Sequence, residues 1–253
     1  MPELPEVETI VRELAPRLQG RHIISVEVLQ PRITRHSKID IARAFPGRRI
    51  EAVRRHGKFI IVDLDQGFVT IHLGMTGQLL FNVDPTPYTR VIFTLDDATL
   101  LYDDTRMFGA VEAGCARVDR LGPDALTALP PQRLQRQAHI KAVLLNQTIF
   151  SGIGNIYADE ALFRAGIRPT ARNISRSRAA KLLLVIEEVL REAIEHRGSS
   201  VSDYVDTEGR RGSFQDHHLV YGRQQQPCTV CGTPIRKVVV AGRGTHYCPK
   251  CQR

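Results

Sequence analysis

The first residues of the chain, MPELPE, could carry out covalent chemistry. Removal of Met1 would leave Pro2 with a free secondary amine on a rigid ring. An unprotonated amine attacks an aldehyde carbon and forms an iminium ion, as Schiff-base lysines do. Glu3 and Glu6 are carboxylates that could move protons beside that amine. The sequence therefore presents a possible nucleophile next to two possible proton carriers.

The same residues are also typical of a helix start, and on spacing alone this is the better interpretation. Pro5 suits the first turn of a helix, where a missing N–H costs nothing. Glu6 and Glu8 suit the positive end of the helix dipole. Apolar residues at positions 7, 10, 11 and 14 form one stripe of an amphipathic helix. This helix is predicted to end near Gln19, before Gly20.

Two Cys-x-x-Cys pairs near the other end of the sequence predict a metal site. Cys228 and Cys231 form the first pair and Cys248 and Cys251 the second, with residues 232–247 between them. Four thiolates at this spacing are typical of a tetrahedral structural zinc site. A redox role is the weaker alternative, and Cys115 is left over. We expect one zinc ion with no open coordination position.

A glycine-rich segment, SGIGN, precedes a predicted helix over residues 155–164. Glycines before a helix start leave backbone N–H groups free to meet a phosphate. Asn155 could cap the helix or contact the phosphate directly. By itself the segment is a weak signal, and an ordinary loop is the more common interpretation.

The charge balance favours a polyanionic partner. Lys and Arg number 35 against 27 Asp and Glu, which gives a net charge of +8. Nucleic acid is the commonest partner of such a chain, although a merely basic protein has the same balance. The first residues lack the apolar core of a signal peptide, and no apolar run is long enough for a membrane span. We therefore expect a cytoplasmic, nucleoid-associated protein.

Short strands dominate the first half of the chain, and helices the second. Strands are predicted over residues 23–29, 49–54, 59–64, 68–73, 91–95 and 99–102, which suggests a β-sandwich or barrel with the first helix attached. Residues 117–131 read as a linker because they contain turn residues and no apolar period. Helices are predicted near residues 140–145, 155–164 and 177–196, and a cysteine-bearing hairpin at the end.

These elements predict an α+β chain of several domains. The predicted division is a catalytic β-sandwich over 1–116, a linker over 117–131, a helical domain over 132–222 and a zinc finger over 223–253. Motifs are distributed over both halves of the chain in an order that resembles one known family.

That family is the formamidopyrimidine-DNA glycosylases, the Fpg branch of the Fpg/Nei family. The start MPELPEVET resembles its N-terminus, and GIGNIYADEALF resembles its helix–two-turn–helix motif. The resemblance covers nearly the whole chain. It implies that Pro2 is the nucleophile after removal of Met1 and that Glu3 is essential for catalysis. Glu6 is a further proton-transfer candidate because of its position beside that amine.

The resemblance also implies which residues hold DNA phosphates. Lys58, after Arg54-Arg55-His56-Gly57, matches the family's lysine near the lesion and is counted with the catalytic residues. His72 and Asn155 match phosphate contacts, and Arg243 matches the arginine of the zinc finger. Taken alone, Lys58 and His72 are more often a solvated charge and a structural histidine.

Three further residues are expected to fill the space left by an extruded base. Met75, between two glycines, is predicted on a turn, where an exposed Met can pack on a base stack. Arg106 and Phe108 match the family's second void-filling loop, in which an arginine pairs with the orphaned base and a phenylalanine wedges the stack. Thr105 and Met107 depart from the family's proline and basic residue.

The segment Glu208-Gly209-Arg210-Arg211-Gly212-Ser213 resembles the loop that closes over a flipped 8-oxoguanine. It is polar and glycine-rich, so we expect it to be mobile until it meets the base. A solvated connector is the alternative.

The implied activity is that of a bifunctional DNA glycosylase and abasic-site lyase acting on double-stranded DNA as a monomer. It would remove oxidised purines, namely 8-oxoguanine and formamidopyrimidines, through a Pro2 Schiff base and then cut the strand by β,δ-elimination. An Nei-type enzyme for oxidised pyrimidines is one alternative, although Leu4 replaces the glycine usual there. A non-catalytic zinc-ribbon protein that binds DNA is the other.

Overall fold

The structure, a computed structural model, describes residues 1–114, 117–127 and 129–253. Cys115 lies outside the described residues. So do residue 116, which precedes the predicted linker, and residue 128 within it. The described chain forms two compact units. Unit 1 consists of Met1–Arg120 and His196–Ser213, and unit 2 of Leu121–Glu195 and Phe214–Arg253. Residues 196–213, predicted within the helical domain, therefore fold with the N-terminal unit.

Unit 1 begins with helix α1, Leu4–Leu18, which confirms the predicted first helix. Its apolar stripe is fully buried at Val7, Ile10 and Leu14. The helix ends where Gly20 takes a positive φ of 88°, a backbone conformation that glycine adopts without strain. The hydrophobic period of the sequence thus fixes which side of α1 faces the core.

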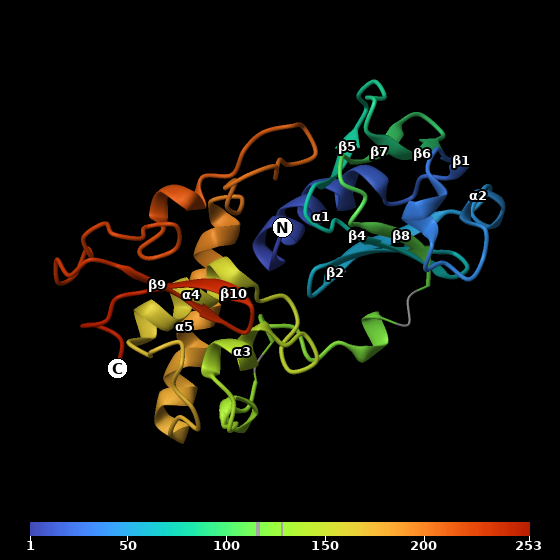
Figure 1. Cartoon of the computed structure of the whole chain (residues 1–253). Helices are drawn as coiled ribbons and strands as arrows, with labels where there is room; N and C mark the ends of the chain where they lie inside the picture. Colours follow the sequence, from blue (N-terminus) through green and yellow to red (C-terminus); the bar gives the residue numbers. More distant parts are fainter. Residues whose placement is uncertain (115–116, 128) are drawn as a thin grey trace. The chain divides into compact units, whose positions relative to one another are not determined.

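Two four-stranded antiparallel sheets make up the rest of unit 1 (Figure 1). The first sheet has the order β1 (Ile23–Val28), β6 (Thr89–Leu95), β7 (Thr99–Asp104), β5 (Gly77–Phe81). The second has the order β2 (Ile50–His56), β3 (Phe59–Leu64), β4 (Phe68–His72), β8 (Ala110–Ala113). Short helical segments lie at Pro31–Thr34, α2 (Ile41–Ala44) and Val118–Arg120.

Strands β5 and β8 were not predicted from the sequence. Each is short, begins at or just after a glycine, and completes an edge by pairing with β7 or β4. Their β-structure depends on these partner strands and not on a pattern of their own. The six predicted strands are all present, and the β3–β4 and β6–β7 hairpins form as expected.

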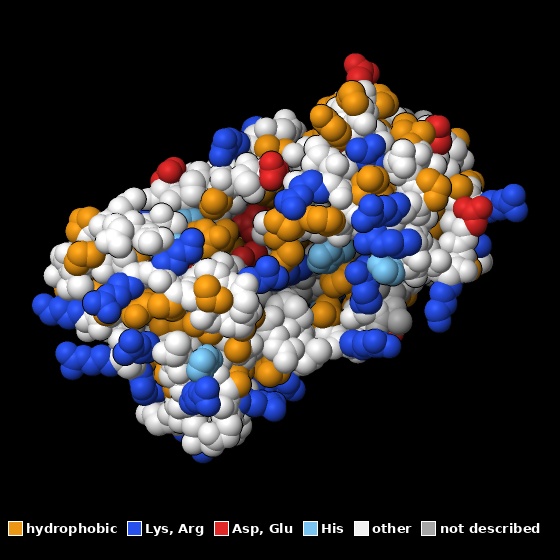
Figure 2. Space-filling model, in the orientation of Figure 1, with side chains coloured by type: hydrophobic (Ala, Val, Ile, Leu, Met, Phe, Trp, Pro, Cys, Tyr) orange, Lys and Arg blue, Asp and Glu red, His pale blue; other side chains and the backbone are white. Residues whose placement is uncertain are grey.

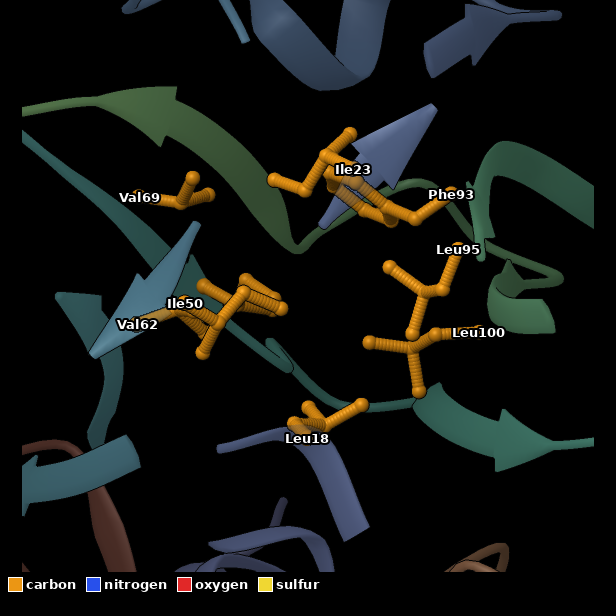
Figure 3. Close-up of a pocket in the computed structure, with 9 residues that line it drawn as sticks. Leu18, Ile23, Ile50, Val62, Val69, Phe93, Leu95 and Leu100 are labelled. Atoms are coloured by element: carbon orange, nitrogen blue, oxygen red, sulfur yellow. The ribbon is translucent and has the colours of Figure 1, made fainter. Parts of the chain in front are cut away.

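The two sheets and α1 share one hydrophobic core. A cavity of about 20 Å³ lies inside this core and is lined only by apolar side chains, among them Leu18, Val62 and Leu100 (Figure 3). A buried water needs two to four polar partners, which this lining does not offer. The cavity is therefore a dry packing defect and not a candidate ligand site.

Unit 2 is helical with one hairpin. It contains α3 (Ile140–Leu145), α4 (Asn155–Ala165), α5 (Arg176–Glu195) and the antiparallel strands β9 (Arg236–Val240) and β10 (Arg243–Tyr247), with short helical turns at Pro131–Leu134 and Phe214–His217. The predicted helices and hairpin are confirmed, and with unit 1 they make the α+β fold expected. No helix among the described residues is long and apolar enough to cross a membrane.

Candidate active site and nucleic-acid-binding residues

The start of α1 is both a helix cap and a cluster of buried acids. Glu3 is the N-cap residue, and its carboxylate accepts the backbone N–H of Glu6, while the N–H of Glu3 donates to Glu6 Oε2 at 2.7 Å. This reciprocal pair is a capping box. Glu3 and Glu6 are 3% and 1% exposed. The helix-cap interpretation and the chemical one therefore describe the same residues.

Glu6 also joins α1 to the segment that returns to unit 1 after α5. Its second oxygen, Oε1, accepts the backbone N–H of Ser199 at 2.7 Å. A Cβ on Gly198 would lie 2.6 Å from that oxygen, so glycine is required there. Glu6 thus holds Ser199 beside the residues that follow Pro2. Met1 precedes Pro2 here, so the ring nitrogen is still an amide and becomes an amine only when Met1 is removed.

Lys58 and His72 lie close together in unit 1. Lys58 is buried at the turn between β2 and β3, and the next residue, Phe59, pairs with His72 across β3 and β4. The rings of Phe59 and His72 have centroids 4.8 Å apart. The guanidinium carbon of Arg117 lies 5.3 Å from the centre of the same Phe59 ring. Sequence reasoning assigned Arg117 to a linker and missed this contact.

His72 is neutral at physiological pH. Burial, followed by the positive charges of Arg117 and Lys58, lowers its pKa to about 4. The backbone N–H of Gly74 donates to His72 Nδ1 at 3.2 Å. Since one nitrogen of a neutral imidazole accepts and the other donates, the proton is assigned to Nε2. His72 can therefore donate a hydrogen bond to a phosphate without carrying a charge.

We expect His72 to make the folded chain less stable in acid. Its folded-state pKa of about 4 lies below the ordinary 6.5, so the unfolded chain takes up a proton first as pH falls through that interval. The free energy of unfolding should decrease across the same interval. Denaturant titrations of wild type and His72→Gln at several pH values should show the stability difference shifting towards the variant. The pKa of His218 is also lowered to about 4, but His218 is present in both proteins, so its contribution cancels in the stability difference. A pH-independent difference would contradict this assignment.

Met75, Arg106 and Phe108 lie on two turns of unit 1. Met75 is 40% and Phe108 46% exposed, which is unusual for large apolar side chains. The Arg106 guanidinium lies 4.7 Å from the centre of the Phe108 ring. Met107 has a positive φ of 53° and packs against the unit 1 core. The departure at Met107 thus adds apolar burial beneath the loop.

Asn155 does not cap α4. Gly154 is the N-cap residue because its extended backbone precedes the first helical residue, and Asn155 is that first residue. The Asn155 side chain instead donates from Nδ2 to the carbonyl of Gly244 at 3.0 Å, and its buried Oδ1 has no hydrogen-bond partner among the described residues. Asn155 therefore binds Gly244, the residue that follows Arg243. The Arg243 side chain is exposed at the start of β10.

A buried ion pair, which sequence reasoning missed, also binds strand β10 next to Gly244. Lys141 Nζ lies 2.6 Å from Asp159 Oδ1, and both side chains are completely buried. Lys141 also donates to Thr245 Oγ1 at 2.8 Å, and Asp159 Oδ2 accepts the N–H of His246 at 2.8 Å. These bonds join α3 and α4 to β10. A lysine inside the apolar part of a predicted helix was the only sequence signal.

The four cysteines of the two Cys-x-x-Cys pairs form a structural zinc site. Their sulfur atoms lie within 4.8 Å of one another, with Cys228 and Cys251 at 3.9 Å and Cys231 and Cys248 at 3.5 Å. Zn–S bonds of about 2.3 Å in a tetrahedron place sulfur atoms about 3.8 Å apart, so the residues fit zinc. Hydrogen bonds from Thr233 lower the pKa of the Cys231 thiol to about 6, whereas burial raises the pKa of the Cys248 and Cys251 thiols.

The segment Glu208–Ser213 is bound to unit 1 through polar contacts. Asp206 Oδ1 accepts the backbone N–H groups of Glu208 and Arg210, each at 2.9 Å. The N–H of Gly209 donates to the Asp206 carbonyl at 3.1 Å. Arg211 donates from Nη2 to the Ser200 carbonyl at 2.5 Å. In this conformation most backbone N–H groups of the segment already have acceptors.

Contacts with α1 complete this arrangement. Glu13 Oε2 accepts both the N–H and the hydroxyl of Thr207, at 3.1 and 2.7 Å, and the side chains of Glu208 and Arg17 form an ion pair. The N–H of Gly212 donates to Ser200 Oγ at 2.9 Å, and that of Ser213 to the His196 carbonyl at 2.9 Å. The segment is held by polar groups although it buries little apolar surface.

Basic side chains dominate the charged surface on one face of the molecule. On the face drawn in Figure 2, Lys and Arg side chains are spread over the molecule and Asp and Glu are sparse. Such a surface is the electrostatic footprint of a protein that binds nucleic acid.

Comparisons with known proteins give consistent matches along the chain. Three family models match successive parts of the chain: the formamidopyrimidine-DNA glycosylase N-terminal domain at residues 1–111, the formamidopyrimidine-DNA glycosylase H2TH domain at 121–205, and the zinc finger found in FPG and IleRS at 225–253. A formamidopyrimidine-DNA glycosylase of Solibacter usitatus is 50% identical over 264 residues, with 100% of both chains covered.

Two solved structures share the fold over almost the whole chain. The MutM (Fpg) protein of Thermus thermophilus superposes with a TM-score of 0.88 at 41% identity, covering 99% of this chain and 98% of that one. A variant of the Lactococcus lactis Fpg in complex with DNA containing Fapy-dG gives a TM-score of 0.89 at 32% identity, with both chains fully covered.

Proposed function

The chain belongs to the formamidopyrimidine-DNA glycosylase family and is a DNA glycosylase, and we propose that it excises oxidised purines through a Pro2 Schiff base and then cuts the strand. The proposed substrates are 8-oxoguanine and formamidopyrimidines in double-stranded DNA. We further propose that it acts as a monomer on the nucleoid in the cytoplasm. Oxidised pyrimidines are the alternative substrate class.

The arrangement at the start of α1 carries this proposal. Pro2 is followed at once by Glu3, whose buried carboxylate is held by the capping box. Glu6 fixes the same turn to Ser199. A nucleophile with a proton carrier in a fixed position beside it is what amine catalysis requires.

The first half of the reaction removes the base. The target nucleotide is extruded from the duplex, since its C1′ cannot be reached within the stack. The Pro2 nitrogen attacks C1′ and the bond from C1′ to the base breaks. Glu3 assists the proton transfers, with Glu6 as the second candidate, and the base departs with a proton. Opening of the sugar ring gives the Pro2 iminium ion.

The second half cuts the strand on both sides of the sugar. The iminium ion withdraws electrons from C1′ and so acidifies the protons at C2′. Loss of a C2′ proton expels the 3′ phosphate by β-elimination, and δ-elimination then expels the 5′ phosphate. Hydrolysis of the remaining iminium ion regenerates the Pro2 amine.

DNA is held by residues from both units. Lys58 and His72 of unit 1 and Asn155 and Arg243 of unit 2 are the proposed phosphate contacts, so affinity should fall steeply with salt. Met75, Arg106 and Phe108 are proposed to fill the space that the extruded base leaves. Their exposure on turns supports this, because an apolar wedge must leave the protein to enter a stack.

The segment Glu208–Ser213 is proposed to close over the extruded purine. Its backbone N–H groups would donate to the carbonyl oxygen of 8-oxoguanine. The N–H groups of Glu208 and Arg210 donate to Asp206 here, so either of them would have to leave Asp206 before it could donate to the base. Polar bonds of this kind exchange at little net cost.

Borohydride trapping tests the proposal. Purified protein would be incubated with duplexes carrying 8-oxoguanine opposite cytosine, an oxidised pyrimidine, or an abasic site, and the covalent product mapped by mass spectrometry. We expect cross-links at residue 2 with the 8-oxoguanine and abasic duplexes. Pro5→Ala, which changes a proline of the same helix start, should retain them.

Three outcomes would contradict the proposal in different ways. A cross-link on a lysine would make Pro2 only a helix residue. Efficient trapping with the oxidised pyrimidine but not with 8-oxoguanine would favour the Nei-type alternative. Binding without any cross-link, in protein whose intact mass shows that Met1 is removed, would favour the non-catalytic alternative.

A further inference from the structure

Asp104 lies at the end of β7, between the two turns that carry Met75 and Phe108. Its side chain is completely buried, and no Lys or Arg side chain pairs with it in the part of the chain that the structure describes. Burying a carboxylate is costly unless hydrogen bonds satisfy it. The groups that donate hydrogen bonds to Asp104 therefore show which parts of the structure this carboxylate holds.

One oxygen of Asp104 joins the two turns directly. Asp104 Oδ1 accepts the hydroxyl of Thr76 at 2.5 Å and the backbone N–H of Arg106 at 3.2 Å. Thr76 is the residue after Met75, and Arg106 begins the turn that carries Phe108. Hydrogen bonds to a charged acceptor are shorter and stronger than neutral ones.

The other oxygen holds the far end of the second turn. Asp104 Oδ2 accepts the backbone N–H of Gly109 at 2.9 Å, and the Tyr102 hydroxyl lies 3.4 Å away. That hydroxyl also lies 3.3 Å from the His72 carbonyl. Burial and the charge of Asp104 raise the pKa of Tyr102 well above its ordinary value, so the hydroxyl keeps its proton as a donor.

The two turns also touch through their backbones. Gly74 has a φ of +60°, and a Cβ placed there would lie 2.5 Å from Gly109 N and from the Phe108 carbonyl carbon. A Cβ on Gly109 would lie 1.7 Å from the Tyr102 hydroxyl. Neither turn can therefore shift alone without disturbing the other or the carboxylate between them.

We propose that Asp104 is a positioning residue that fixes the Met75 turn and the Arg106–Phe108 turn to each other, so that the three side chains enter the duplex as one rigid group. This inference rests on the proposed function of those side chains. Rigid attachment lowers the entropy lost on insertion, and it sets where Arg106 meets the base opposite the lesion. Asp104 thereby controls opposite-base discrimination without touching DNA.

Asp104→Asn tests the role with the same shape. An amide offers one acceptor and one donor, so either the N–H of Arg106 or that of Gly109 must lose its acceptor. We expect the preference for 8-oxoguanine opposite cytosine over adenine to fall about tenfold, which corresponds to about 1.4 kcal/mol. Cleavage of a duplex with a preformed abasic site, which needs no base to be extruded, should change much less.

Asp103→Asn is the matched control. Asp103 is the preceding residue and is also buried, but it accepts hydroxyl bonds from Thr86 and Thr89 and none from the two turns. It should leave the discrimination ratio unchanged. Thr76→Val removes only the bond to the Met75 turn and should reproduce part of the loss of discrimination. Thr76→Ser keeps the hydroxyl and should discriminate as wild type does.

The outcomes separate this inference from the proposed function. If wild type cuts both lesions and Asp104→Asn keeps its discrimination, the positioning role is wrong. Equal losses on all duplexes in both aspartate variants would also overturn it, because they would indicate general destabilisation. If wild-type protein fails to trap on abasic DNA, the proposed function fails first, whatever Asp104 does.

Discussion

Replacing Glu3 by Gln is expected to reduce excision of 8-oxoguanine by about 10²-fold or more, while cleavage at a preformed abasic site changes little. General acid–base catalysis contributes about 10² to 10⁴ to a rate. Departure of the base needs a proton, whereas a preformed abasic site already presents an aldehyde carbon to Pro2. The loss should therefore appear only when a glycosidic bond must break.

The capping box allows Gln to replace Glu3 without loss of the hydrogen bonds at the helix start. The Glu3 carboxylate accepts the N–H of Glu6 at the helix start, and the carbonyl oxygen of a Gln can accept the same bond. The N–H of Glu3 still donates to Glu6. Gln thus preserves the cap and removes only the ability to exchange a proton.

Single-turnover kinetics on the two duplexes measures the effect. Glu8→Gln is the matched control, because Glu8 lies on the same helix and its carboxylate pairs with Arg12 and Arg55. It should leave both rates unchanged. Equal loss of both activities in Glu3→Gln, with an intact helix signal in circular dichroism, would mean that Glu3 does not act on the base.

Local patterns predicted much of the fold and of this site. The first helix follows from its apolar period, and the zinc cluster from the spacing of four cysteines, since both are encoded within short stretches. The six strands with strong β-type runs were found for the same reason. The possible cap at Asn155 was wrong because the helix begins at Asn155 itself, and the extended residue before it is Gly154.

What the sequence did not reveal depends on distant contacts. Asp104 looks like any polar residue at a strand end until Thr76 and Gly109 converge on it. Lys141 becomes significant only when Asp159 and Thr245 approach from other elements. Residues 196–213 follow a helix of unit 2, yet Glu6 and Glu13 bind them to unit 1.

Loss of zinc is the second large effect, and we expect it to reduce DNA affinity by about 10²-fold or more while leaving most helix and sheet signal intact. Binding of structural zinc is itself folding free energy for the segment that holds it. Cys228 and Cys248 are buried with Ile235, Val220 and Phe163 in a small core of their own. Without the metal this core should open, whereas the core of unit 1 contains none of these residues.

The bonds between β10 and the helices determine what remains without zinc. Asn155 holds the Gly244 carbonyl, and Asp159 holds the N–H of His246. These bonds keep one strand attached, but Arg243 lies before them at the end of the hairpin, where it pairs with Val240 of β9. Its orientation towards phosphate should therefore be lost when the hairpin opens.

Cys228→Ser and chelator-treated wild type test this expectation together. Elemental analysis should give one zinc per chain in native protein, and both treatments should lower DNA affinity and its salt dependence, as Arg243→Ala should to a smaller extent. Cys115→Ser, which changes the one cysteine outside the two Cys-x-x-Cys pairs, is the matched control and should bind zinc and DNA normally. Full DNA binding by zinc-free protein would show that the bonds from Asn155 and Asp159 alone suffice to place Arg243.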